Sequence, residues 1–135
     1  ERPVLGIAAA MAPFKCCVTG LSSNSQFSTT VSKLHKDMCR SGVSCRVDES
    51  TAAIGRRYSR IDEIGVPLVV TVDFDTAVNG GVTVRDRDSC EQIRVPLTAV
   101  VQLVGDMTHG LSRVSWEEAK TRFPRFHAGN SVEGE

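Results

Sequence analysis

The chain has 135 residues, of which 41% are hydrophobic and 24% charged, and its 16 basic and 16 acidic residues give a formal net charge of zero. This length predicts one domain that buries about two thirds of the surface exposed by the unfolded chain. The composition is typical of a globular domain and excludes a fibrous or intrinsically disordered chain. Since the whole chain carries no net charge, a site for a polyanion has to be a local basic patch.

The cysteines do not form the pattern of a disulfide framework or a zinc site. There are five, an odd number, and no two of them have CxxC spacing. We therefore predict buried, reduced thiols and a reducing compartment, which is the cytosol or an organelle matrix. The apolar stretch 3–13 is too short to span a bilayer, so no membrane segment is expected, and we interpret it as a linker.

The first half of the chain alternates between strand and helix patterns. Residues 14–19 predict a buried strand, and the helical spacing of the apolar residues over 27–38 predicts a helix. Residues 43–48 alternate and predict a half-exposed strand. A second helix is expected over 51–64 and a strand over 68–74. This order predicts right-handed crossovers and a parallel three-stranded sheet.

The second half predicts a hairpin added to that sheet. A turn at 79–81 precedes two short strand patterns, 82–87 and 91–95. A third helix follows over 97–107, and a capping box at Ser115 opens a short fourth one. The predicted fold class is α/β, with a mixed five-stranded sheet flanked by helices.

In such a sheet a ligand favours the carboxyl ends of the strands at the point where the strand order reverses. The first and third strands flank this point, and residues 20–24 follow the first strand. We therefore expect a binding site near this segment.

Two catalytic arrangements are open but not favoured. Either cysteine of the first strand could pair with His35 or His109, although adjacent cysteines in a strand point to opposite faces. Asp73 and Asp75 resemble a carboxylate pair, but they lie where a strand becomes a loop. No GxxxxGK[ST], GxGxxG or HExxH motif is present.

Arginines form the most informative cluster. Arg56, Arg57 and Arg60 lie on the second predicted helix, and Arg85 and Arg87 share a face of the fourth strand. Acidic residues are interleaved with them, so surface ion pairs are one interpretation. The other is contact with phosphates and unstacked bases, as in the recognition of single-stranded RNA. Spacing alone leaves both open.

Several segments together resemble the anticodon-binding domain of eukaryotic-type glycyl-tRNA synthetases. They cover nearly the whole chain in the expected order. The matching segments are 12–16 (APFKC), 54–65 (IGRRYSRIDEIG), 71–76 (TVDFDT), 84–89 (VRDRDS), 92–94 (QIR), Ser115-Trp116 and Phe123-Pro124.

The resemblance implies the three-layer fold of the class II synthetases for glycine, histidine, proline and threonine. Its sheet has the order 2-1-3-4-5, with strand 4 antiparallel. Residues 13–127 would form the domain, with 1–12 a linker from a catalytic domain and 128–135 a flexible tail.

The resemblance also implies binding to the anticodon stem-loop of glycine tRNA, in which the second and third anticodon nucleotides are cytosines. The parent enzyme would be a homodimer that attaches glycine to tRNA using ATP and Mg²⁺. This domain would have no cofactor and no catalytic residue. The expected location is cytoplasmic, with a mitochondrial location also open.

Related domains use the loop after strand 1, the second helix and strands 4 and 5 to hold the anticodon. In the threonine member, an acidic residue on the second helix contacts the anticodon, and Arg60 aligns with it here. The residues implied at the anticodon are Arg60, Arg85 and Arg87, followed by Arg57, Glu63, Ser23 and Asn24.

The alternative is a non-catalytic protein-interaction module. The same fold serves in this way in the accessory subunit of a mitochondrial DNA polymerase.

Overall fold

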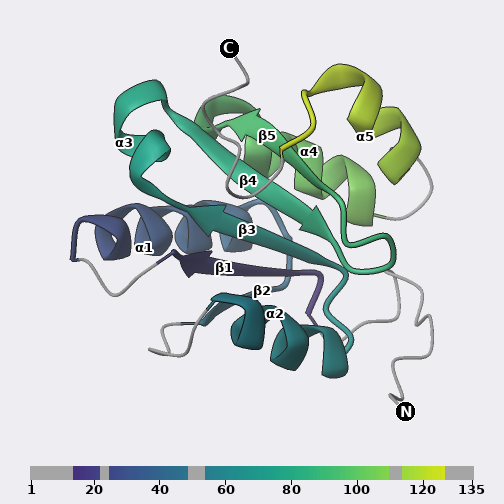
Figure 1. Ribbon diagram of the computed structural model, residues 1–135, viewed down its shortest axis with the longest axis horizontal. Helices are drawn as coiled ribbons and strands as arrows, with labels where there is room; N and C mark the ends of the chain where they lie inside the picture. Colours follow the sequence, from purple (N-terminus) through teal and green to yellow (C-terminus); the bar gives the residue numbers. More distant parts are fainter. Residues whose placement is uncertain (1–13, 22–24, 49–53, 110–113, 127–135) are drawn as a thin grey trace.

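The chain folds into a five-stranded sheet with helices on both faces (Figure 1). The computed structural model describes residues 14–21, 25–48, 54–109 and 114–126. In chain order the elements are β1 (Cys16–Gly20), α1 (Ser25–Arg40), β2 (Cys45–Asp48), α2 (Ile54–Glu63), β3 (Leu68–Val72), α3 (Phe74–Asn79), β4 (Gly81–Asp86), β5 (Gln92–Pro96), α4 (Leu97–Thr108) and α5 (Trp116–Arg122).

The sheet has the strand order β2-β1-β3-β4-β5. β1 runs parallel to both β2 and β3, whereas β4 is antiparallel to β3 and to β5. The predicted parallel three-stranded unit and the added hairpin are therefore confirmed, as is the order implied by the resemblance. No helix in the described parts of the chain is long and apolar enough to cross a membrane.

The two faces of the sheet differ in character. On one face, alternate residues of β3, β4 and β5 pack with α1 and α4 into the main apolar core; they include Val70, Val84 and Ile93. On the other face α2 buries a smaller cluster around Ile61 and Val69. Because side chains alternate along a strand, the intervening residues of β4 and β5 point toward the α2 side, and they are polar. These residues are Thr83, Arg85, Gln92 and Arg94.

α3 is an element that the sequence did not predict. Residues 68–74 read as one strand followed by a turn, yet the chain enters a helix at Phe74. Asp73 caps this helix. Its carboxylate accepts from the backbone N–H of Thr76, and the Thr76 hydroxyl accepts from the backbone N–H of Asp73. Gly80, with φ of 77°, ends the helix in the left-handed region that favours glycine.

All five cysteines are free thiols. The prediction of burial is confirmed for Cys16, Cys17 and Cys45 and is wrong for Cys39 and Cys90, which are exposed. Cys39 lies near the end of α1, and Cys90 lies in the turn between β4 and β5.

Glu91 ties the β4–β5 hairpin to α5 and to the segment that follows it. Its Oε1 accepts hydrogen bonds from Trp116 Nε1 at 2.9 Å and from Lys120 Nζ at 2.8 Å. Its Oε2 lies 3.2 Å from Arg125 Nη2. The hydrogen bonds from Lys120 and Trp116 lower the pKa of Glu91 from 4.5 to about 2.

We expect Glu91→Gln to flatten the acid side of the stability profile. A carboxyl group whose pKa is depressed by folding stabilises the native state above its unfolded pKa of 4.5, and this contribution is lost as the pH falls toward about 2. Melting temperatures measured by circular dichroism should therefore differ between wild type and variant at neutral pH and converge across that window. Glu118→Gln, which removes a carboxylate paired with Arg122 within the exposed face of α5, is the control. A difference in melting temperature that stays constant with pH would contradict the assignment.

Candidate nucleic-acid interface

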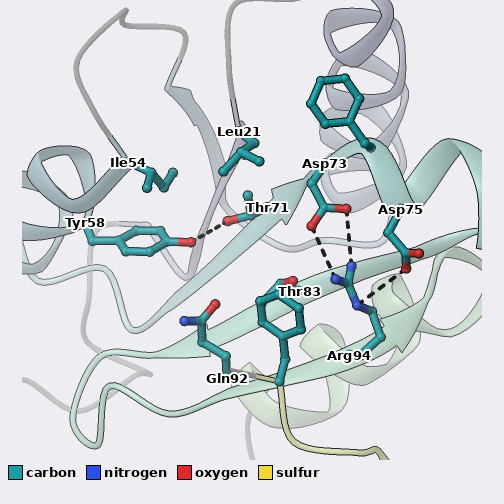
Figure 2. Close-up of a pocket in the computed structure, with 11 residues that line it drawn as sticks. Leu21, Ile54, Tyr58, Thr71, Asp73, Asp75, Thr83, Gln92 and Arg94 are labelled. Carbon is teal, nitrogen blue, oxygen red and sulfur yellow. Dashed lines mark hydrogen bonds and ion pairs between the residues drawn. The ribbon is translucent and has the colours of Figure 1, made fainter. Parts of the chain in front are cut away.

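A cavity of about 340 Å³ opens on the polar face of the sheet, beside the carboxyl ends of β1 and β3 (Figure 2). The strand order reverses at this point, so the cavity lies where a ligand was expected. Leu21, which follows β1, forms part of its wall. The lining residues are Leu21, Ile54, Tyr58, Thr71, Asp73, Phe74, Asp75, Thr83, Gln92, Arg94 and Phe126.

Aromatic residues from three parts of the chain line this cavity. They are Tyr58 on α2, Phe74 at the start of α3 and Phe126 after α5. Phe74 is 57% exposed, and its ring meets the buried ring of Phe27 edge-on, with 4.9 Å between centroids. Exposed rings beside polar groups are what proteins use to stack unpaired nucleobases.

The carboxylates of the cavity are held by an arginine. Arg94 Nη1 and Nη2 lie 3.4 and 3.3 Å from the two carboxylate oxygens of Asp73, and Nε lies 3.8 Å from Asp75 (Figure 2). Asp73 also caps α3. These contacts favour a structural role for the pair over the catalytic dyad considered from the sequence.

The thiol–imidazole hypothesis is not favoured either. Cys16 and Cys17 are fully buried, and burial raises the pKa of Cys17 to about 12, so this thiol stays protonated at neutral pH. The Nε2 atom of His35 lies 3.1 Å from the Cys45 carbonyl oxygen, and that of His109 lies 3.3 Å from the Gly42 carbonyl oxygen.

Thr83 lines the cavity and has an unsatisfied buried hydroxyl. The residue is 2% exposed, and its Oγ1 has no hydrogen-bond partner among the described residues. A buried hydroxyl without a partner costs roughly 1–3 kcal/mol. A ligand whose polar edge reaches this atom would remove this cost, since a hydroxyl both donates and accepts.

Arg57, predicted from the sequence as a weaker anticodon contact, is 3% exposed. Its guanidinium donates to the Thr19 hydroxyl at 2.6 Å and to the carbonyls of Gly20 at 2.5 Å and Leu21 at 2.9 Å. It therefore fastens α2 to the end of β1, next to the cavity.

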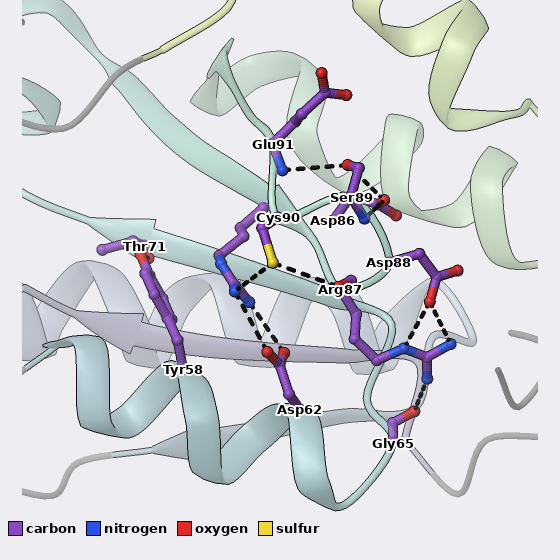
Figure 3. A network of polar contacts seen from close by, with 11 residues as sticks. Tyr58, Asp62, Gly65, Thr71, Asp86, Arg87, Asp88, Ser89, Cys90 and Glu91 are labelled. Carbon is purple, nitrogen blue, oxygen red and sulfur yellow. Dashed lines mark hydrogen bonds and ion pairs between the residues drawn. The ribbon is translucent and has the colours of Figure 1, made fainter. Parts of the chain in front are cut away.

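Arg85, one of the three leading candidates, lies between the sheet and α2. Its two terminal nitrogens lie 3.0 and 3.3 Å from the carboxylate oxygens of Asp62, and Nη2 lies 3.3 Å from Cys90 Sγ. Figure 3 labels these two partners, Asp62 and Cys90. The Arg85 guanidinium carbon lies 4.6 Å from the centroid of the Tyr58 ring. Arg85 thus holds Tyr58 and Asp62 of α2 against β4.

Arg87 is 7% exposed and points to the turn after α2. Its Nη1 donates to the Gly65 carbonyl at 2.9 Å, and its Nη2 lies 3.0 Å from Asp88 (Figure 3). The sequence placed Arg85 and Arg87 on one face, and both do meet the α2 side. Their burial, however, gives them internal partners, and contact with tRNA stays a prediction that this geometry does not favour.

The remaining candidates lie in different surroundings. Arg60 has a half-exposed side chain, and its Nη2 lies 3.4 Å from Asp48 at the carboxyl end of β2. Glu63 is exposed at the end of α2. Ser23 and Asn24 lie outside the described residues.

The cavity contains polar residues that sequence analysis did not nominate. Thr83, Gln92 and Arg94 occupy the polar positions of two alternating strands. The alternation of both strands is visible in the sequence, but of the residues on these two strands only the arginines of β4 were predicted to contact a ligand.

Residues 15–107 match the protein family described as "Anticodon binding domain". The chain is 39% identical over 135 residues to a glycine--tRNA ligase of Bombyx mori, covering 99% of this chain and 18% of that protein. It is 34% identical over 134 residues to the mitochondrial glycine--tRNA ligase 1 of Saccharomyces cerevisiae, covering 99% of this chain and 19% of that protein. The chain thus spans about a fifth of the length of these relatives.

The crystal structure of the RNA binding domain of threonyl-tRNA synthetase from Cryptosporidium parvum Iowa II superposes with a TM-score of 0.68 and 18% identity. It covers 77% of this chain and 26% of that one, and at this identity it supports the fold alone. The family match, in contrast, covers well over half of the sequence and all five strands of the sheet. The chain therefore belongs to the anticodon binding domain family.

Proposed function

We propose that this chain is the anticodon-binding domain of a glycine–tRNA ligase and that it binds the anticodon stem-loop of glycine tRNA. The observation that carries the proposal is the similarity to glycine–tRNA ligases along 99% of the chain. The cavity supports it, since its aromatic residues and an unsatisfied hydroxyl suit an unpaired base. The protein-interaction alternative is not favoured by these matches.

In this proposal an unpaired anticodon base enters the cavity and stacks on an aromatic ring of its wall. The polar edge of the base then meets the Thr83 hydroxyl and the Gln92 amide. Cytosine presents one amino donor next to ring and carbonyl acceptors, and a hydroxyl together with an amide offers both donors and acceptors. Arg94 and the two aspartates shape the wall.

The activity of the whole protein is also a proposal. Attachment of glycine to tRNA with ATP and Mg²⁺ would take place in a catalytic domain that this chain joins, and this chain would contribute no catalytic residue. The parent would act as a homodimer in the cytoplasm, with a mitochondrial location also open.

Binding of the 135-residue chain to labelled 17-nucleotide hairpins, measured by fluorescence anisotropy, tests the proposal. We expect weak binding, because zero net charge gives little non-specific attraction to phosphates. A hairpin with cytosines at the second and third anticodon positions should bind more tightly than one with uridines there. Equal affinity for the two hairpins would refute the proposal.

We expect Arg60→Ala to reduce this discrimination by about 1–3 kcal/mol, the range for a bidentate side-chain contact with a base. Arg60 is half-exposed at the carboxyl edge of the sheet, where an anticodon nucleotide would approach. The measurement is the ratio of dissociation constants for the two hairpins. Arg40→Ala, which removes the same charge from an exposed position on α1, is the control. An unchanged ratio in the Arg60 variant would remove this residue from the site.

A further inference from the structure

The segment after α5 forms one wall of the cavity. The backbone N–H of Arg94 donates to the Pro124 carbonyl at 2.8 Å, and the N–H of Phe126 donates to the Gln92 carbonyl at 2.9 Å. Ile93 and Arg125 form a β-bridge between these two bonds. This C-terminal segment (residues 124–126) therefore lies along β5 like a short additional strand and carries Phe126 to the cavity.

The ring of Phe126 does not serve the apolar interior. Phe123, which directly precedes the C-terminal segment, packs against the main core, whereas Phe126 belongs to neither of the two core clusters. Its side chain is half-buried and lines the cavity. An aromatic ring that is held in place without filling a core is available for a ligand.

Arg94 fixes the orientation of this ring. Its guanidinium carbon lies 4.5 Å from the centroid of Phe126. The guanidinium N–H groups are directed to Asp73, Asp75 and the Gly81 carbonyl, so the group is anchored at its edges. The Arg94 guanidinium lies over one face of the Phe126 ring, which leaves the rest of the ring for contact with a ligand in the cavity.

We propose that Phe126 is a stacking surface for a nucleobase bound in the cavity and that the C-terminal segment is part of the RNA-binding site. The inference rests on the proposed function, because it needs an unpaired base as the ligand. A ring backed by a fixed cation is preorganised, so little conformational entropy is lost when a base stacks on it.

Anisotropy titrations of the 135-residue chain with two hairpins test this role. One hairpin carries cytosines at the second and third anticodon positions, and the other carries abasic nucleotides there, which keep the phosphates but remove the bases. Phe126→Ala and Phe126→Leu should each weaken binding of the cytosine hairpin by roughly 10-fold or more. Neither should change binding of the abasic hairpin, and Phe126→Trp should restore wild-type affinity for the cytosine hairpin.

Val78→Ala is the matched control, because Val78 is an 80% exposed apolar residue of α3 outside the cavity lining. If circular dichroism shows that Phe126→Ala is unfolded, Phe126→Leu carries the test, because it keeps an apolar side chain at this position. If wild type discriminates between the hairpins and the Leu variant does so equally well, or if both hairpins lose affinity equally, this inference alone is overturned. If wild type does not discriminate at all, the proposed function and the inference fall together.

Discussion

Replacing Asp62 by Ala should lower the free energy of unfolding by about 3–5 kcal/mol, the usual cost of removing one partner from a buried ion pair. Asp62 and Arg85 are 7% and 8% exposed, and two hydrogen bonds join them across the space between α2 and β4. Without the carboxylate, the Arg85 guanidinium stays enclosed without its charge partner. Urea denaturation followed by circular dichroism measures the change.

Asp88→Ala is the matched control for this experiment. Asp88 also pairs with an arginine, Arg87, at 3.0 Å, but its side chain is 71% exposed. Because water screens the exposed Asp88 carboxylate and the buried Arg87 keeps its hydrogen bond to the Gly65 carbonyl, the loss should be only about 0–1 kcal/mol. Similar losses of stability in the two variants would show that the Asp62–Arg85 pair is not the buried link between α2 and the sheet described above.

Arg57→Ala is expected to cost about 2–4 kcal/mol, since it removes charged hydrogen bonds and takes the donor from one buried hydroxyl and two part-buried carbonyls. The affected acceptors are those of Thr19, Gly20 and Leu21 at the end of β1. Arg57→Lys should recover only part of the loss, because one ammonium group cannot reproduce the fork of a guanidinium. The same denaturation experiment gives both values.

Arg56→Ala is the control for the Arg57 variants, because Arg56 occupies the adjacent position of α2 and is exposed. Arg56→Ala should change stability by no more than about 0.5 kcal/mol, as is usual for surface substitutions. If the two arginine variants lose stability to the same extent, the internal role of Arg57 is wrong.

The sheet could be predicted from the sequence because each strand carried its own local signal. β-branched runs and alternation identified the strands, and helical spacing identified α1 and α4. α3 was not predicted, because it has only six residues and follows directly on the β-branched run of β3. Its capping signal, Asp73 with Thr76 three residues on, was present in the sequence, but the contact of Asp73 with Arg94 comes from a strand 21 residues away.

The burial of the arginines could not be predicted for a similar reason. The sequence showed acidic residues interleaved with Arg57, Arg85 and Arg87, and the two-residue period placed the latter two on one face. Which carboxylate or carbonyl each would meet depends on how α2 packs on β1 and β4, which joins residues 22 or more positions apart. Local patterns therefore identified the arginines but not their partners.

The cavity was predicted in position but not in composition. The reversal of strand order between β1 and β3 gave the place. Phe126 comes from the far end of the chain, and its proximity to Gln92 and Arg94 arises only when the C-terminal segment lies along β5.

The pairing of the C-terminal segment with β5 also bears on contacts between copies of the domain. β5 is the last strand of the sheet, and an outer strand with unpaired backbone groups is a template for strands of other chains. The bonds to Pro124 and Phe126 occupy such groups on β5, and the opposite outer strand, β2, has only four residues. Three residues past the last helix thus protect the domain against aggregation through its sheet, so the solubility of the molecule and the wall of its cavity depend on the same short piece of polypeptide.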